Sequence, residues 1–294
     1  MNMVELIKKY CSFSKIDKDA EIEFVNSLSL ILSDSEKASK LGDLIAQYQK
    51  DYSTCEKVIE EMKALFQSVG VHEYTANVVS YILLIPALKK EYEKRNIDNE
   101  IFENTILDMS YHINYCKTLK GVWGTFTSWH LNFFTLKGFG IGRLQFFAKF
   151  FEEDFASENI SVKTGEPFLD VHIPNTGTPL TVDACEESYA KAAEFFKDHF
   201  NGKPIVFSCA SWLCWHKHFE ILSPSSNIYK FASRYTIVKK KLFKDAPWIW
   251  RIFNAEYNGN LDNLKPTTSL QRIYYDLIKN GEELGWDTGI FIYN

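Results

Sequence analysis

The hydrophobic pattern of this 294-residue chain changes its period once, near Thr135. Before that residue, apolar side chains recur at intervals of three and four, as at Phe24, Leu28 and Ile31, which is the spacing of one face of an α-helix. After it, glycines alternate with apolar residues over 138–142, a period of two that is typical of extended chain. The change excludes both a uniform helical bundle and a single sheet.

The length also favours two domains, because 294 residues exceed the size at which one hydrophobic core usually stops growing. We expect an all-helical N-terminal domain over 1–132. Residues 133–294 should form an α+β or α/β domain, a mixed sheet flanked by helices. In the first domain Pro86 should kink or divide its helix, because proline lacks an amide hydrogen and clashes with the preceding turn. Further helices are expected over 101–112 and 122–134.

The second domain should contain a strand at 168–173, where apolar and polar residues alternate. A helix should follow over 182–200, with Asp183 and Glu186 as an N-terminal capping pair. The nearly continuous apolar run 205–213 predicts a central strand that is covered on both faces.

Charge and composition exclude several classes of function. The net charge is −5, and the 33 basic residues are spread along the chain, so we expect no nucleic-acid partner. The longest apolar run, 78–88, is much shorter than the roughly 20 residues that cross a bilayer, so we expect no membrane segment. The six cysteines have no framework spacing, and the chain opens without a signal-like region, which favours reduced thiols in the cytoplasm.

Four short strings follow one another in an order and spacing that resemble a known family. They are Gly142-Arg143-Leu144-Gln145-Phe146, Leu169-Asp170-Val171-His172-Ile173-Pro174, Cys209-Ala210-Ser211-Trp212-Leu213 and Ser226-Asn227-Ile228. The chain resembles bacterial acyltransferase-domain proteins, which pair a helical N-terminal region with a GNAT-like C-terminal domain. The resemblance covers nearly the whole C-terminal part, while the helical part agrees mainly in its position.

The resemblance implies that acyl-coenzyme A is a co-substrate, held in the opening between two splayed strands. Its pyrophosphate would lie on the turn before the next helix, because amides at a helix N-terminus attract phosphate oxygens. The residues implied to bind it are Ile173, Asn175, Thr176, Gly177 and Thr178. The turn departs from the family pattern at Pro174 and Pro179, which have no amide hydrogen to offer a phosphate.

Asp170 and His172 are the first candidates for catalysis. Two residues apart on a strand, their side chains share a face within about 7 Å, which suits an acid–base pair. Histidine can then take a proton from an attacking amine or hydroxyl. The alternative is that the two groups only complete hydrogen bonds in a polar patch.

Cys209 and Ser211 share a face of the next expected strand, so a Cys209 nucleophile served by His172 is a second possibility. The alternative is a small buried thiol, since a GNAT-type reaction needs no covalent intermediate. The alternating Cys214, His216 and His218 lack the paired knuckles of a zinc site, so we expect no metal.

Several other residues are candidates for the substrate pocket, with ordinary packing or ion pairing as the alternative. Arg143 could bind a carboxylate or phosphate, and Gln145 or Ser211 could stabilise an oxyanion. The remaining candidates are Trp129, beside His130, together with Trp212 and Asn227.

The sequence therefore predicts an enzyme that moves an acyl group from acyl-coenzyme A to a small-molecule amine or hydroxyl acceptor. Two other hypotheses stay open. One is a non-catalytic binding module that has lost the standard pyrophosphate turn, which Pro174 and Pro179 favour. The other is a transferase or hydrolase with a cysteine nucleophile.

Overall fold

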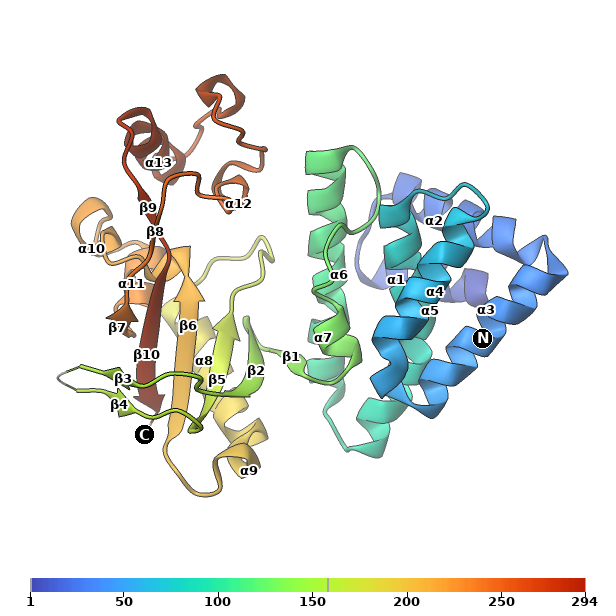
Figure 1. The fold of residues 1–294 in the computed structure, drawn as a ribbon, viewed down its shortest axis with the longest axis horizontal. Helices are drawn as coiled ribbons and strands as arrows, with labels where there is room; N and C mark the ends of the chain where they lie inside the picture. The colour runs from blue at the N-terminus through green and yellow to red at the C-terminus, as the bar shows by residue number, and fades with distance from the viewer. Residues whose placement is uncertain (1, 158, 294) are drawn as a thin grey trace. The chain divides into compact units, whose positions relative to one another are not determined.

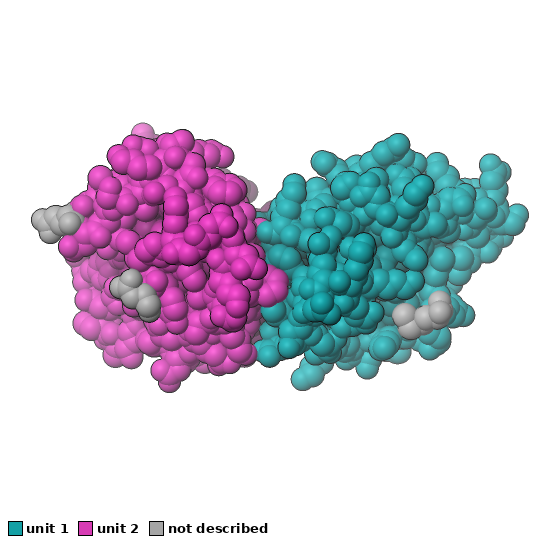
Figure 2. Space-filling model, turned by 90° about the horizontal axis from the view of Figure 1, so that it is seen from below, with its two compact units in different colours: residues 1–140 teal, residues 141–294 magenta. Residues whose placement is uncertain are grey.

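The computed structural model describes residues 2–157 and 159–293, and the chain divides into two compact units, Met1–Gly140 and Ile141–Asn294 (Figures 1 and 2). The first unit is built from helices, and the second from a mixed sheet with helices around it. The predicted fold class is confirmed.

The helices of the first unit begin where short polar side chains can cap them. Asp17, Asp34 and Asp98 each accept a hydrogen bond from an amide in the first turn of the helix that follows. The helices are α1 (Met3–Phe13), α2 (Lys18–Leu32), α3 (Ser35–Lys50), α4 (Cys55–Gln67), α5 (Glu73–Lys94), α6 (Asn99–Lys120) and the short α7 (Leu131–Phe134). Among the described residues, no helix is both long and apolar enough to span a membrane.

Helix α5 is the centre of the first unit. All residues from 75 to 85 are buried, so this helix is covered on every side. Pro86 does not divide it, and that part of the prediction is wrong. A proline inside a helix costs roughly 3 kcal/mol, and packing of this surrounded segment offsets such a cost.

The expected helix over 122–134 is also wrong, because only its last four residues, α7, are helical. A Cβ atom on Gly124 would lie 2.3 Å from the carbonyl of Tyr74, so this glycine packs directly on the α5 backbone. The Asn77 side chain donates to the carbonyls of Thr125 and Thr127. These carbonyls therefore bond to α5 instead of continuing a helix.

The second unit contains a six-stranded sheet in the order β1-β2-β5-β6-β10-β7. Its strands are β1 (Gly138–Ile141), β2 (Leu144–Phe150), β5 (Pro167–His172), β6 (Ile205–Ser211), β7 (Thr236–Lys239) and β10 (Asp287–Tyr293). The pairs β2–β5, β6–β10 and β10–β7 are antiparallel, and β5 and β6 are parallel. Parallel neighbours need a crossover, which α8 (Val182–Phe195) and α9 (Lys197–Phe200) provide.

Shorter elements complete the second unit. Two small antiparallel ribbons pair β3 (Phe155–Ala156) with β4 (Ser161–Val162), and β8 (Leu242–Phe243) with β9 (Leu284–Gly285). The remaining helices are α10 (His218–Ile221), α11 (Asn227–Ala232), α12 (Trp250–Phe253) and α13 (Ser269–Lys279). The strand expected to reach residue 213 ends at Ser211, after which a 3-10 turn begins.

The cap of α8 differs from the prediction. Thr181 is the N-cap, and its hydroxyl accepts from the amide of Ala184, whereas Asp183 and Glu186 lie inside the helix. Glu186 instead forms an ion pair with Arg234 at 3.1 Å. A hydroxyl at the N-cap satisfies the free amides as well as a carboxylate does, which is why the acidic residues are not needed there.

Candidate active site

The parallel strands β5 and β6 part before they end. Their paired residues are Leu169 with Phe207 and Asp170 with Ser208, whereas β5 continues to His172 and β6 to Ser211 (Figure 1). The carboxyl ends of the two central strands are therefore free of mutual pairing in the described chain. In an α/β sheet, ligands bind beyond the carboxyl ends of strands.

The Asp170–His172 pair lies at this opening. The Nε2 of His172 is 3.0 Å from Oδ2 of Asp170, which is hydrogen-bond distance. The Lys149 ammonium, from β2, contacts the same oxygen at 2.5 Å. The ring of Phe147 packs edge-on against His172 with centroids 5.0 Å apart. The histidine side chain is 33% exposed and the aspartate 15%, so the ring faces solvent while the carboxylate is more enclosed.

The surroundings keep Asp170 ionised. Burial on its own would raise the pKa of this carboxyl, but the hydrogen bond and charge of His172 and the Lys149 ammonium outweigh it, so the pKa lies below its usual value. A carboxylate in this position favours a proton on the ring nitrogen that faces it. With that proton on Nε2, the basic lone pair of the neutral ring is on Nδ1.

Arg143 supports the turn between β5 and α8. Its guanidinium donates to the carbonyls of Pro174 at 2.8 Å and Thr178 at 3.2 Å. Within the turn, the amide of Thr176 donates to the Pro174 carbonyl, and the amide of Thr178 to the Thr176 hydroxyl. Two of the five positions implied to bind a pyrophosphate therefore already use their amides inside the turn.

Cys209 and Ser211 do not face His172, so the geometry assumed for a cysteine nucleophile is wrong. Asp170 pairs with Ser208, which places Asp170 and His172 on one face of the sheet and Cys209 and Ser211 on the other. Their face is the one under α8, where Tyr189 packs on Phe207. The hydrogen bond with Cys214, together with burial, raises the pKa of the Cys209 thiol well above its usual value. Ser211 accepts from the Leu213 amide.

The other pocket candidates are dispersed. Gln145 is directly opposite His172 in the β2–β5 register and is 3% exposed, so it shares the face of the dyad. Trp212 stacks on Trp248 at 5.8 Å in a separate aromatic core. Asn227 is the first residue of α11. Trp129 belongs to the first unit and packs edge-on against Phe133.

A second aspartate–histidine pair was not predicted. His216 Nδ1 lies 2.7 Å from Oδ2 of the fully buried Asp287, although the two residues are 71 positions apart. The contact of Lys149 with Asp170 was also not predicted. Its position could have been inferred from the alternation in β2, which puts Gln145, Phe147 and Lys149 on one face, but no local pattern links His216 to the start of β10.

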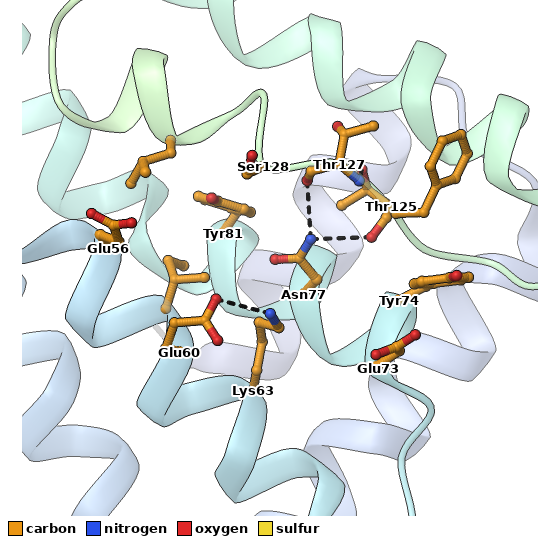
Figure 3. Close-up of a pocket in the computed structure, with 13 residues that line it drawn as sticks. Glu56, Glu60, Lys63, Glu73, Tyr74, Asn77, Tyr81, Thr125, Thr127 and Ser128 are labelled. Carbon is orange, nitrogen blue, oxygen red and sulfur yellow. Dashed lines mark hydrogen bonds and ion pairs between the residues drawn. The ribbon is translucent and has the colours of Figure 1, made fainter. Parts of the chain in front are cut away.

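Three hollows of the structure lie away from the dyad. One of about 460 Å³ lies in the first unit, where Lys63 pairs with Glu60 and Asn77 holds the neighbouring backbone (Figure 3). A second hollow, of about 860 Å³, is lined mainly by residues of α2. In the second unit, a cavity between α8 and α11 measures about 20 Å³, which is room for about one water. Chemistry locates the candidate site here better than cavity volume does.

The sheet topology, the parted strands and the dyad define a GNAT-like protein with a helical N-terminal domain. Family models match both parts: an N-acyltransferase N-terminal domain over residues 8–136 and a GNAT-like C-terminal domain over residues 139–291. The chain belongs to this family of two-domain GNAT-like acyltransferases, and the resemblance inferred from the sequence is confirmed. No curated protein matches the chain.

Several solved structures with a similar fold are acyltransferases. One, in complex with decanoyl-CoA and teicoplanin, is 21% identical with a TM-score of 0.74, and the match covers 98% of this chain and 87% of that one. An acyltransferase mutant in complex with octanoyl-CoA is 21% identical with a TM-score of 0.75, over 99% and 88%. A complex with CoA and 10C-teicoplanin is 20% identical with a TM-score of 0.74, over 98% and 87%.

Proposed function

We propose that this protein transfers an acyl group from acyl-coenzyme A to an amine or hydroxyl of a small-molecule acceptor. The observation that carries the proposal is the Asp170–His172 pair at the point where β5 and β6 part. The family supports the reaction class. The similar solved structures hold acyl-CoA or CoA, and two of them also hold a teicoplanin.

His172 acts as the general base in this mechanism. It takes the proton from the acceptor as the amine or hydroxyl attacks the thioester carbonyl, and the coenzyme A thiolate leaves. Asp170 is a positioning residue, because its carboxylate fixes the ring and stabilises the imidazolium that forms. Among the predicted oxyanion donors, Gln145 lies directly opposite His172 in the β2–β5 register and is the proposed donor.

The turn after β5 is the proposed place for the pyrophosphate. Arg143 holds the turn in shape through two carbonyls. The amide of Gly177, at a φ of 73°, donates to no acceptor in the described part of the chain. Glu186, whose charge at the start of α8 opposes a phosphate, is paired with Arg234. Of the five implied positions, the backbone amides of Ile173, Asn175 and Gly177 are the proposed contacts of the phosphates.

Calorimetry and a thiol-release assay test the function. Acetyl-, octanoyl- and decanoyl-CoA are titrated first, and an acceptor amine is then added while free coenzyme A is measured. We expect saturable binding and turnover, with kcat lowered about 10²- to 10⁴-fold by His172→Ala at unchanged affinity for coenzyme A. His199→Ala, which changes a half-buried histidine of the same unit outside the dyad, is the matched control.

The outcomes separate the alternatives. Binding without turnover for any acceptor would favour the non-catalytic module, and no heat at millimolar ligand would remove coenzyme A altogether. A loss of rate in Cys209→Ala with His172→Ala unchanged would restore the covalent route. A loss confined to His216→Ala would assign the base to the other aspartate–histidine pair.

A further inference from the structure

Three potential metal ligands converge inside the first unit, far along the chain from the residues assigned to acyl transfer. Asp108 and His112 are four residues apart on α6, which puts them on one face of the helix. His130 comes from the segment that precedes α7. One ligand atom from each residue lies within 4.8 Å of the other two. From the sequence, His130 stood out only as the neighbour of the pocket candidate Trp129.

The distances in this cluster fit a tetrahedral ion. Oδ2 of Asp108 is 3.4 Å from Nε2 of His112 and 3.4 Å from Nε2 of His130. Zinc binds carboxylate oxygen and histidine nitrogen at about 2.0–2.1 Å, so two ligand atoms of a tetrahedral site are about 3.3 Å apart. Octahedral ligands at the same bond length would be closer, at about 2.9 Å. These two distances therefore match a four-coordinate ion, and the ligand atoms of the two histidines lie within 4.8 Å of each other.

The burial of His130 indicates that its ring binds a partner outside the protein chain. Its side chain is fully buried, and neither ring nitrogen has a hydrogen-bond partner in the described chain, although Nε2 faces the Asp108 carboxylate. A buried polar group without a hydrogen bond costs roughly 1–3 kcal/mol. Coordination through Nε2 would satisfy the nitrogen that faces the cluster.

The surroundings supply an outer contact and a route to solvent. His112 Nδ1 is 3.5 Å from the hydroxyl of Thr127, the kind of second partner that orients a ligating imidazole. Thr127 and Tyr81 line the 460 Å³ hollow (Figure 3). The Tyr81 ring also packs against His130. The His112 side chain is 18% exposed, so an ion can reach the cluster without unfolding the unit.

We infer that Asp108, His112 and His130 bind one Zn²⁺ ion, the fourth position being taken by water. The ion ties α6 to the irregular segment 121–130, which has little secondary structure of its own. Two histidines and one carboxylate are a zinc ligand set known from proteins. The inference replaces the expectation that the chain holds no metal, and it is independent of the proposed acyl transfer.

Titration of chelator-treated full-length protein with ZnCl₂ tests the inference, with calorimetry as the readout. We expect one Zn²⁺ per chain. His112→Ala changes the most exposed of the three ligands and should weaken binding at least as much as the roughly 10- to 100-fold lost with an outer-shell partner. His199→Ala, in the other unit, should bind as the wild type does. Circular dichroism checks that each variant is folded.

Substitution with Co²⁺ needs no variant and identifies the ligands. A tetrahedral nitrogen–oxygen site gives visible d–d bands without a thiolate charge-transfer band. Three results would each overturn the inference: no saturable Zn²⁺ binding at about 100 µM, equal affinity in His112→Ala, or a thiolate band that places the ion on cysteine. Should His112→Ala not fold, Asp108→Asn and the Co²⁺ spectrum of the wild type decide.

Discussion

Single side chains at the candidate active site owe their roles to strand geometry. A spacing of two on β5 places Asp170 and His172 on one face, and the neighbouring β2 adds Lys149 to the same carboxylate oxygen. The same alternation turns Cys209 toward α8, away from the dyad. A shift of one residue along a strand moves a side chain to the other face. His172 can therefore accept a proton at the opening, whereas the Cys209 thiol is enclosed and protonated.

Replacing Asp170 by asparagine tests whether the carboxylate positions the histidine. An asparagine amide that donates to the ring would favour the opposite tautomer and would not stabilise an imidazolium. We expect kcat to fall by at least about tenfold, though less than in His172→Ala, while KM for acyl-coenzyme A stays unchanged. Steady-state kinetics over a range of pH measures both constants.

A merely structural role would give a different pattern. If Asp170→Asn lowered the melting temperature and raised KM with kcat intact, the pair would be a polar patch of the sheet. Phe168→Leu, on the same strand, is the matched control for packing, and its kcat should equal that of the wild type.

At the scale of elements, a separate aromatic core surrounds a buried histidine in the second unit. His218 bonds to the Tyr274 hydroxyl at 2.7 Å and lies beside Trp212 and Trp215. Burial lowers its pKa from 6.5 to about 4, with the backbone hydrogen bond to Leu213 opposing the shift. The folded protein therefore holds this histidine neutral at pH values where the unfolded chain protonates it.

The pH dependence of stability follows from this difference. Because the unfolded chain takes up the proton near pH 6.5 and the folded chain only near pH 4, acidification between these values favours unfolding. Two to three pKa units correspond to about 3 kcal/mol, lost progressively over that window and constant below it. Urea unfolding followed by tryptophan fluorescence at several pH values measures the loss.

His218→Gln removes the titrating group and keeps a hydrogen-bonding side chain for Tyr274. Its free energy of unfolding should be nearly independent of pH between 6.5 and 4, apart from a constant loss from altered packing. An equal slope in this variant and the wild type would assign the pH dependence to other groups.

The elements that local patterns define were predictable, and those that depend on distant contacts were not. The alternation of apolar and polar residues located the strand at 168–173 within one residue. The segment 122–134 was misassigned because Gly124 and Asn77, 47 positions apart, fix its backbone on α5. The prediction that Pro86 divides its helix was wrong for the same reason. The free-energy cost of the proline is offset by packing around α5, which no local pattern reveals.

The residues of the candidate sites were predictable to the same extent. The dyad followed from one strand, whereas Asp287 beside His216 and His130 beside Asp108 are pairs that only the fold brings together. Which residues of β5 and β6 share a face of the sheet could not be predicted either, because the crossover sets the parallel register and neither strand does so alone. The boundary after residue 132 stays a prediction.

At the scale of the whole molecule, the two units carry different optical probes. Five of the seven tryptophans, Trp212, Trp215, Trp248, Trp250 and Trp286, belong to Ile141–Asn294, so fluorescence reports mainly on that unit. The first unit is built almost wholly from helices, so far-ultraviolet circular dichroism reports mainly on Met1–Gly140. Each unit has a core of its own, and separate cores allow separate unfolding transitions.

We therefore expect the two probes to give different midpoints in thermal or urea unfolding, and Zn²⁺ to move only one of them. An ion that binds the folded first unit at about 100 times its Kd stabilises that unit by about 2.7 kcal/mol, because only the folded form gains the binding energy. The circular dichroism midpoint should rise while the fluorescence midpoint stays in place, and His112→Ala should abolish the rise. Coincident midpoints that shift together with Zn²⁺ would mean that the units unfold as one cooperative block, and a shift seen by fluorescence alone would place the ion in the second unit.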